Sequence, residues 1–442
     1  MKKINFKPYF EKANSLKLTP FEISYSSSRT TTVSTFNGKV EAQEIGNNSS
    51  LTAKGLFAGK LGIYSLDSIS KNSVDELVDG VFEASKYGKE EVKEHFYKNN
   101  GAKYKKVKIN YNDFEEATLI SLRKLALELD ALVSKKDKRI TKIETAINME
   151  ESFFQKENDL GLKYSNKSHG FSGSISIVAE QDGEPRSSYI VFKSFKSLDE
   201  LKANALKKID ELVSSSVDFF KSGPIASKTY RAVLSPSVVV SLLSFYVEQL
   251  SAKSVIEHLS IFENKLNEQI CSKKLTITHT PFKPSFSASS IDAEGHPTSE
   301  FKVIKNGVLL NYFHSLETSL KMKVEDNGCG SGNGNASPIS LTVKEGKKTV
   351  EDGFKTIKNG VYITDVSGLN SGINSQTLDF SLPCQGYQVK DGVKSNATSM
   401  IIISGNLKDL FFNIKEVFND VEEHGGIFSP SCSVSKIAVS GK

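Results

Sequence analysis

A long run of alternating apolar and polar side chains near the start of the chain most constrains how it can fold. Between residues 21 and 66 the alternation is interrupted by turn signals at Asn37-Gly38 and Gly46-Asn47-Asn48. Successive side chains of a β-strand point to opposite faces, so this pattern predicts an antiparallel meander. Residues 141–192 show strand character again, with a turn at Asp182-Gly183, and predict further strands.

Helical periodicity separates and follows these strand blocks. Apolar residues recur three and four positions apart over residues 73–88, 112–134 and 197–220, which predicts three helices. Ser222-Gly223-Pro224 then breaks the pattern and marks the expected domain boundary. We therefore predict an α+β fold whose N-terminal domain, residues 1–222, combines an antiparallel sheet with long helices.

The second predicted domain, residues 225–442, is richer in β structure. It should open with a helix over residues 236–250 and a further helical stretch that reaches Gln269. Beyond Leu275 the pattern predicts hairpins, a helix that begins at Asn406 and a closing strand over residues 433–439. The three hairpin turns are expected at Asn306-Gly307, Asn359-Gly360 and Asp391-Gly392.

Composition excludes several classes of protein. The formal charge is +5, and the chain has only five arginines, whose guanidinium groups suit base and phosphate recognition, so direct nucleic-acid binding is not expected. The longest apolar stretch, residues 238–247, is interrupted by two serines, whereas a membrane span needs ~20 apolar residues. No signal peptide and no C-x-x-C pair is visible, which predicts a cytoplasmic protein without a membrane segment or a disulfide framework.

The histidines offer little metal chemistry at helical spacing. No two of the seven lie three or four residues apart, and H-E-x-x-H is absent. Asp292, Glu294 and His296 alternate and could converge on a cation from one face of a strand. Gly295 and Pro297 interrupt that strand, however, and favour a polar loop instead.

A glycine-rich run over residues 327–335 is the sharpest local anomaly. It matches neither a dinucleotide-binding G-x-G-x-x-G nor a P-loop. Two interpretations stay open, a flexible surface loop and a loop that faces a substrate. Cys329 and Cys384 could be nucleophiles, yet nothing in the sequence places a histidine beside either.

Three groups of segments resemble the TldD/PmbA family, and specifically its PmbA (TldE) branch. They occur in the family's order along nearly the whole chain: residues 36–41 with 55–64, residues 332–341 with 344–368, and residues 379–387 with 403–411 and 432–441. The resemblance implies an α+β N-terminal domain, a β-rich, barrel-like C-terminal domain and pairing as dimers. In this family the TldD members look like zinc peptidases, with two imidazoles and a glutamate from an H-E-x-x-x-H helix and a thiolate from a late cysteine.

The resemblance also implies what this chain lacks. Ser244, Phe245 and Gln249 stand where the two histidines and the glutamate would be, and Cys432 stands where the late cysteine would be. We therefore expect no zinc, no other metal and no cofactor, and no catalytic residue in this chain. TldE partners of this kind complete the proteolytic chamber of a TldD subunit that trims unfolded peptides, including a microcin leader, and the family is linked to modulation of DNA gyrase.

Three functional hypotheses follow. The first is a non-zinc subunit that binds extended peptide, through Cys329, Gly332, Gly334 and Asn335, beside a TldD-like zinc peptidase or a second copy of itself. The alternative is a stand-alone homodimeric module that binds peptides or proteins without catalysis. A third is a hydrolase that uses Cys384 or the cluster from Asp292 to His296.

Overall fold

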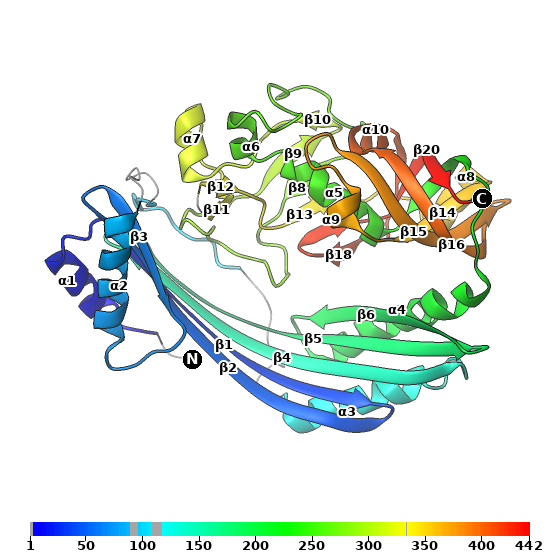
Figure 1. The fold of residues 1–442 in the computed structure, drawn as a ribbon, viewed down its shortest axis with the longest axis horizontal. Coiled ribbons are helices and arrows are strands. Elements are labelled where there is room, and N and C mark those ends of the chain that lie inside the picture. The colour runs from blue at the N-terminus through cyan, green and yellow to red at the C-terminus, as the bar shows by residue number, and fades with distance from the viewer. Residues whose placement is uncertain (1–2, 89–95, 108–116, 333) are drawn as a thin grey trace. The chain divides into compact units, whose positions relative to one another are not determined.

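A computed structural model describes residues 3–88, 96–107, 117–332 and 334–442. The chain divides into two compact units, residues 1–220 and residues 221–442, just before the Ser222-Gly223-Pro224 break (Figure 1). Each unit has hydrophobic clusters of its own. Among the described residues, no helix is both long and apolar enough to cross a bilayer.

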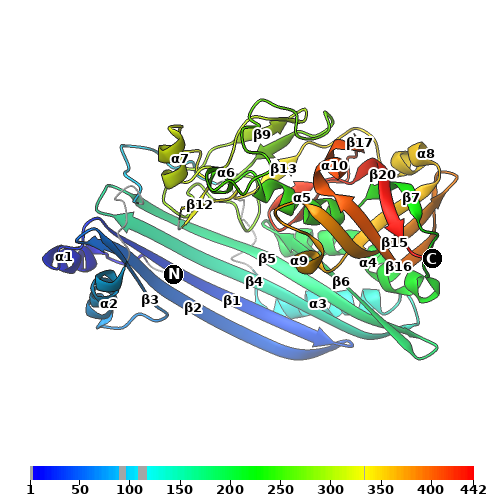
Figure 2. The ribbon, with the colours of Figure 1, turned by 45° about the horizontal axis from the view of Figure 1, so that its top comes forward.

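Unit 1 is built on one long, strongly curved antiparallel sheet (Figures 1 and 2). The strand order is β3-β2-β1-β4-β5-β6, and β1 pairs along its whole length with β2 and for fifteen residues with β4. The predicted antiparallel sheet is thereby confirmed. Its strands are β1 (Phe21–Phe36), β2 (Lys39–Phe57), β3 (Lys60–Leu66), β4 (Ile140–Asn158), β5 (Lys163–Gln181) and β6 (Glu184–Ser194). The turn expected at Gly46-Asn47-Asn48 is wrong, because these residues lie within β2 and pair with residues 28–30 of β1.

Helices cover one face of this sheet, because one alternating set of side chains is apolar. Val33 and Ile147 pack with α3 (Leu119–Val133) and α4 (Leu198–Val217), and Ile23 and Leu51 pack with α1 (Lys7–Ser15) and α2 (Ser73–Tyr87). Thr118 caps α3 by accepting a hydrogen bond from the Ser121 N–H. The helix predicted from residue 112 therefore begins only at Leu119, and residues 112–116 lie outside the described residues.

The opposite face of the sheet is rich in hydroxyl and amide groups. Cross-strand hydrogen bonds join Ser26 to Ser50 and Thr32 to Asn148, both at 2.7 Å between the side-chain oxygens. These groups alternate with the apolar residues on the same strands, so the period-2 pattern read from the sequence separates a helix-covered face from a polar one.

Unit 2 contains a closed five-stranded barrel (Figure 1). The ring runs β16-β15-β14-β7-β20 and closes where Ile402 to Ser404 of β16 pair with β20. The β-rich, barrel-like prediction is confirmed. Its strands are β7 (Lys228–Leu234), β14 (Gly360–Val366), β15 (Asp379–Lys390), β16 (Val393–Asn406) and β20 (Cys432–Ser440), with the short β17 (Ile414–Val417) on the outer edge of β20.

A second six-stranded sheet in unit 2 has the order β10-β9-β8-β13-β19-β18, and a separate hairpin is formed by β11 and β12. The strands are β8 (Ile277–His279), β9 (Phe301–Lys305), β10 (Val308–Leu309), β11 (Gly330–Gly332), β12 (Asn335–Ala336), β13 (Leu341–Val343), β18 (Glu422–His424) and β19 (Ile427–Ser429). The helices are α5 (Pro236–Glu248), α6 (Ala252–Ile256), α7 (Leu316–Met322), α8 (Val350–Ile357), α9 (Leu369–Gly372) and α10 (Leu407–Phe412), preceded by a 3₁₀ turn (Asp218–Lys221).

Two expected elements of unit 2 are wrong. The helical stretch does not reach Gln269, because α6 ends at Ile256 and turns follow it. Asn359-Gly360 is not a hairpin turn, since it joins α8 to β14, and α8 opens with a capping box between Thr349 and Asp352. The hairpins about Asn306-Gly307 and Asp391-Gly392 are confirmed, with Lys305 opposite Val308 and Lys390 opposite Val393.

Candidate functional site

A groove in unit 2 runs along one side of α5. Its cavity is about 320 Å³ and is lined by α5, by residues 336–341 and by residues 425–427, together with Phe313. Ser235 and Pro236 start α5, because the Ser235 hydroxyl accepts a hydrogen bond from the Val238 N–H and proline needs no intrahelical donor at this position. The helix then presents Ser244 and Glu248 to the groove from its exposed side.

The α5 residues that the family resemblance aligns with a zinc motif have other partners. The Gln249 amide donates to the Ser375 carbonyl at 2.7 Å, and its oxygen accepts from the Ile261 N–H at 3.1 Å. The Ser244 hydroxyl donates to the Ser241 carbonyl one turn earlier. Phe245 packs against the main apolar cluster of unit 2. This helix therefore offers no imidazole and no carboxylate at those three positions, and the donor set does not fit zinc.

Cys432 does not change that conclusion. Its side chain is fully buried at the start of β20, and its thiol lies 3.8 Å from the Pro430 carbonyl. Burial, reinforced by the charge of Asp420, raises the pKa of the thiol well above its ordinary value. One cysteine also supplies only one donor, whereas a zinc site needs three or four protein ligands.

The glycine-rich run forms a hairpin. Gly330 pairs with Ala336 and Gly332 with Asn335, so β11 and β12 form a two-stranded ribbon. Asn335 is exposed at its tip, whereas Gly334 is buried and its carbonyl accepts a hydrogen bond from the Ser315 hydroxyl at 3.0 Å. The chain beyond β12 continues as the 336–341 wall of the groove, whose lining includes Ser244 but none of the predicted loop residues Cys329, Gly332, Gly334 and Asn335.

A buried histidine that was not singled out from the sequence supports this wall. His279 lies in β8, its Nδ1 donates to the Ser299 carbonyl at 2.8 Å, and its Nε2 accepts from the Ile339 N–H at 3.2 Å. The Cys329 sulfur lies 3.9 Å from the same Nε2. Position in an apolar strand was the only sequence signal for His279, and fifty residues separate it from Cys329.

The Cys329–His279 pair is not arranged as a catalytic dyad. Burial, together with the charges of Asp292 and Asp326, raises the pKa of the Cys329 thiol well above its ordinary value. Burial lowers the pKa of His279 to about 4. The pair therefore stays as a neutral thiol beside a neutral imidazole, while a reactive cysteine needs a stabilised thiolate. Cys384 is also buried, and desolvation raises its pKa to about 12.

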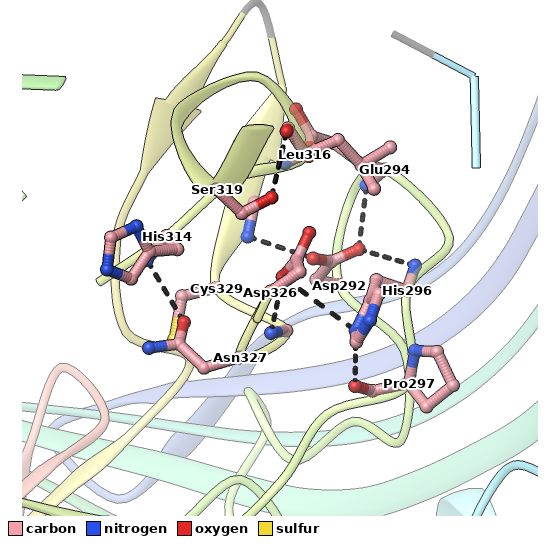
Figure 3. Close-up of polar contacts among 12 residues, drawn as sticks. Asp292, Glu294, His296, Pro297, His314, Leu316, Ser319, Asp326, Asn327 and Cys329 are labelled. Atoms are coloured by element: carbon pink, nitrogen blue, oxygen red, sulfur yellow. Dashed lines mark hydrogen bonds and ion pairs between the residues drawn. The ribbon is translucent and has the colours of Figure 1, made fainter. Parts of the chain in front are cut away.

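The carboxylates predicted to share a face separate into two roles (Figure 3). Asp292 and His296 come together with Asp326, which sequence inspection did not connect to them. Glu294 turns instead to α7, where its Oε2 accepts a hydrogen bond from the Leu316 N–H at 2.7 Å. Asp326 lies 34 residues from Asp292 in the sequence, and only the fold brings the two together.

Asp292 connects its own turn to the hairpin. Its Oδ1 accepts hydrogen bonds from three successive backbone N–H groups at residues 294–296, and its Oδ2 accepts one from the Gly330 N–H at 2.9 Å. Desolvation and the neighbouring Asp326 charge raise the pKa of Asp292 to about 7. The Asx turn explains why the segment is a loop, as Gly295 and Pro297 predicted.

Comparison with known proteins identifies the fold. Residues 227–441 match the model of the PmbA/TldA metallopeptidase C-terminal domain. Over 421 residues the chain is 23% identical to a metalloprotease of Methanocaldococcus jannaschii, which covers 90% of this chain and 89% of the relative. A PmbA metalloprotease homolog of Buchnera aphidicola subsp. Baizongia pistaciae is 25% identical over 316 residues, 70% of this chain and 67% of the relative.

Solved structures resemble the chain over its whole length. A Thermotoga maritima protein proposed to modulate a DNA gyrase superposes with a TM-score of 0.85 at 25% identity, over 98% of each chain. TldE from Thermococcus kodakarensis has the same fold, with a TM-score of 0.83 at 18% identity over 98% of this chain and 100% of that one. A curved antiparallel sheet in one unit and a closed five-stranded barrel in the other thus define a metalloprotease-related class of protein. The sequence and structural matches together support the TldD/PmbA family.

Proposed function

We propose that this chain is a non-zinc subunit that binds extended peptide and completes the proteolytic chamber of a TldD-type zinc peptidase. One observation carries the proposal. A groove of about 320 Å³ runs beside α5, yet the positions that the family resemblance aligns with a zinc motif hold Ser244, Phe245 and Gln249. A binding groove without the metal donor set is what a substrate-holding partner requires.

The lining of the groove suits an unfolded peptide. Pro338, Ile339 and Ile427, each partly exposed, supply apolar surface, while Ser244 and Glu248 supply polar groups along the exposed side of the helix. Residues 337–340 of the wall lie outside any strand, and the N–H groups of Ser337, Ile339 and Leu341 already donate within unit 2. The groove would therefore hold a peptide through its shape and side chains, with little sequence preference. The hairpin residues Cys329, Gly332, Gly334 and Asn335 lie outside the lining of this groove, so their part in the proposal is to hold the start of the 336–341 wall in place.

Blocking the groove tests peptide binding directly. Ser244→Trp adds a large side chain at an exposed helix position, where the serine hydroxyl donates to the Ser241 carbonyl of the same helix. We expect this variant to melt like the unmodified chain but to bind a fluorescein-labelled unstructured peptide at least ~10-fold more weakly, as measured by anisotropy. Glu257→Trp, at an exposed position of unit 2 outside the groove, is the matched control and should bind normally.

The partner requires a second measurement. Affinity purification of this chain from its source cell, followed by identification of co-purifying proteins, should recover a TldD-like subunit. Adding that subunit should then produce cleavage of the labelled peptide, which Ser244→Trp slows and Glu257→Trp does not. Peptide binding that is equal in all three chains would contradict the groove assignment.

A stand-alone homodimeric binding module is the second candidate. The same groove would serve this candidate. It would be favoured if the chain binds peptide, recovers no TldD-like partner and sediments as a dimer of 48.6 kDa chains. In that case the peptide-binding half of the proposal stands, and the chamber-completing half does not.

A further inference from the structure

Two buried aspartates and a histidine meet beside the base of hairpin β11–β12 (Figure 3). Asp292, His296 and Asp326 each present one possible ligand atom, and the three atoms all lie within 4.8 Å of one another. The two aspartates come from different loops, one before β9 and one between α7 and β11. The cluster therefore lies where two separate segments of unit 2 meet.

One oxygen of this cluster has no partner. The Asp326 side chain is 7% exposed, and its Oδ1 accepts a hydrogen bond from the Gly328 N–H at 2.8 Å. Its Oδ2 is buried and accepts no hydrogen bond from any described residue. A buried carboxylate oxygen left unpaired costs free energy that a bound cation would recover.

The charges of the cluster are also unbalanced. All four hydrogen bonds that Asp292 accepts among the described residues come from backbone N–H groups, which bring no full positive charge. The His296 Nδ1 lies 3.8 Å from the Asp326 Oδ1 and supplies one charge only when the ring is protonated. Asp326 also raises the pKa of Asp292, so the two carboxyl groups repel each other when both are ionised.

We propose that Asp292, His296 and Asp326 bind a divalent transition-metal ion, of the Mn²⁺ or Zn²⁺ class. Two carboxylates and an imidazole are a mixed donor set, which suits these ions better than Ca²⁺ or Mg²⁺, whose sites are built from oxygen alone. Ligands about 2.2 Å from one tetrahedral ion lie about 3.6 Å apart, so the three side chains would have to close in by up to about 1 Å when the ion binds.

Access and coupling to the hairpin follow from the same geometry. The His296 side chain is 24% exposed, which gives an ion a route to the otherwise buried aspartates. Its Nδ1 is hydrogen-bonded to the Pro297 carbonyl at 2.8 Å, so binding through this nitrogen gives up that bond and should leave the affinity modest. Because Gly330 donates to Asp292 and Gly328 to Asp326, a bound ion would stiffen the base of β11–β12.

Metal titration of the full chain tests the site. After chelator treatment, we expect the chain to bind one Mn²⁺ at pH 7.5, measured from the loss of the free-ion EPR signal, and Zn²⁺ to compete. Asp326→Asn and His296→Gln should each weaken Mn²⁺ binding at least ~10-fold. His258→Gln is the matched control, because His258 also lies beside a carboxylate, that of Glu263, but on the surface.

The two variants keep the test decisive. If Asp326→Asn fails to melt like the unmodified chain, the comparison of His296→Gln with His258→Gln decides the outcome, because His296 is partly exposed. A chain that binds neither Mn²⁺ nor Zn²⁺ in a saturable way would mean that the carboxyl pair holds a proton instead. That result, or binding that both cluster variants leave unchanged, would overturn the proposal.

Discussion

Two histidines of unit 2, His279 and His314, are held as neutral imidazoles. Burial lowers the pKa of each to about 4. His279 has a partner on both ring nitrogens, whereas the His314 Nδ1 is buried without a hydrogen-bond partner among the described residues. The sequence shows only the spacing of these histidines, which excludes a helical metal pair. It cannot show their burial, because that depends on strands and loops far along the chain.

The buried His314 should make the folded state sensitive to acid. Its pKa is about 4 when folded and ~6.5 when unfolded, so below pH 6.5 the unfolded chain binds more protons. The stabilisation is complete above pH 6.5 and is lost as the pH falls towards 4, by about 2 kcal/mol at pH 5. Urea unfolding at pH 7 and pH 5 measures this loss. The drop in the free energy of unfolding between the two pH values should be about 2 kcal/mol smaller for His314→Leu than for the unmodified chain.

The exposed His258, whose side chain is 77% exposed, provides the control for this measurement. His258→Leu should keep the acid sensitivity of the unmodified chain. An identical loss of stability in all three chains between pH 7 and pH 5 would show that His314 does not titrate in this range.

At the scale of single elements, hairpin β11–β12 gives a local reason for each glycine of the run. Gly328, Gly332 and Gly334 have φ of +70°, +93° and +71°, a region that glycine adopts most readily. Gly330 lies against the carboxylates of Asp292 and Glu294, with no space for a side chain. The composition anomaly is thus accounted for by turn geometry and packing, and contact with a peptide stays a proposal.

Gly330→Ala should destabilise unit 2. The added methyl group would collide with the Glu294 carboxylate and lie 2.9 Å from the Asp292 Oδ2. Neither carboxylate can move aside cheaply, because Glu294 accepts from the Leu316 N–H and Asp292 accepts from Gly330 itself. We expect a loss of about 1–3 kcal/mol in urea unfolding. Ser331→Ala, at the exposed neighbouring position, should stay within ~0.5 kcal/mol, and equal stability of both variants would refute the packing argument.

Turn dipeptides show how far sequence reasoning reaches at this scale. Asn306-Gly307 and Asp391-Gly392 were correctly predicted as hairpin turns, because the strands on both sides pair with each other. Asn359-Gly360 was assigned wrongly, since the same dipeptide there ends α8 and β14 pairs in parallel with β7. A turn dipeptide predicts that the chain changes direction, but not whether the flanking segments are two paired strands. Here the apolar spacing of Val350, Phe354 and Ile357 was the sequence sign that a helix precedes the turn.

At the scale of the whole molecule, the two units differ in how much their sequence can reveal. The sheet of unit 1 is made largely by neighbouring strands, so local alternation predicts it. The barrel of unit 2 closes through β20, which pairs with β7 about two hundred residues earlier and also with β16. The candidate sites have the same dependence on distant segments, since Asp326 reaches Asp292 and Ser244 reaches the 336–341 wall only in the folded unit.

Removing the closing strand should therefore unfold one unit and spare the other. A chain truncated after Ser431 loses Val434, Ile437 and Val439 from the main apolar cluster of unit 2. Without β20, the edges of β7 and β16 that pair with it have no partner strand. The four remaining strands then form an open sheet instead of a closed barrel. Unit 1 keeps its complete sheet and its own clusters. Limited proteolysis with mass spectrometry should recover a stable fragment close to residues 1–220 and none from residues 221–431, while the full chain should yield stable fragments from both units. Protection of residues 221–431 in the truncated chain would show that the barrel does not depend on closure by β20.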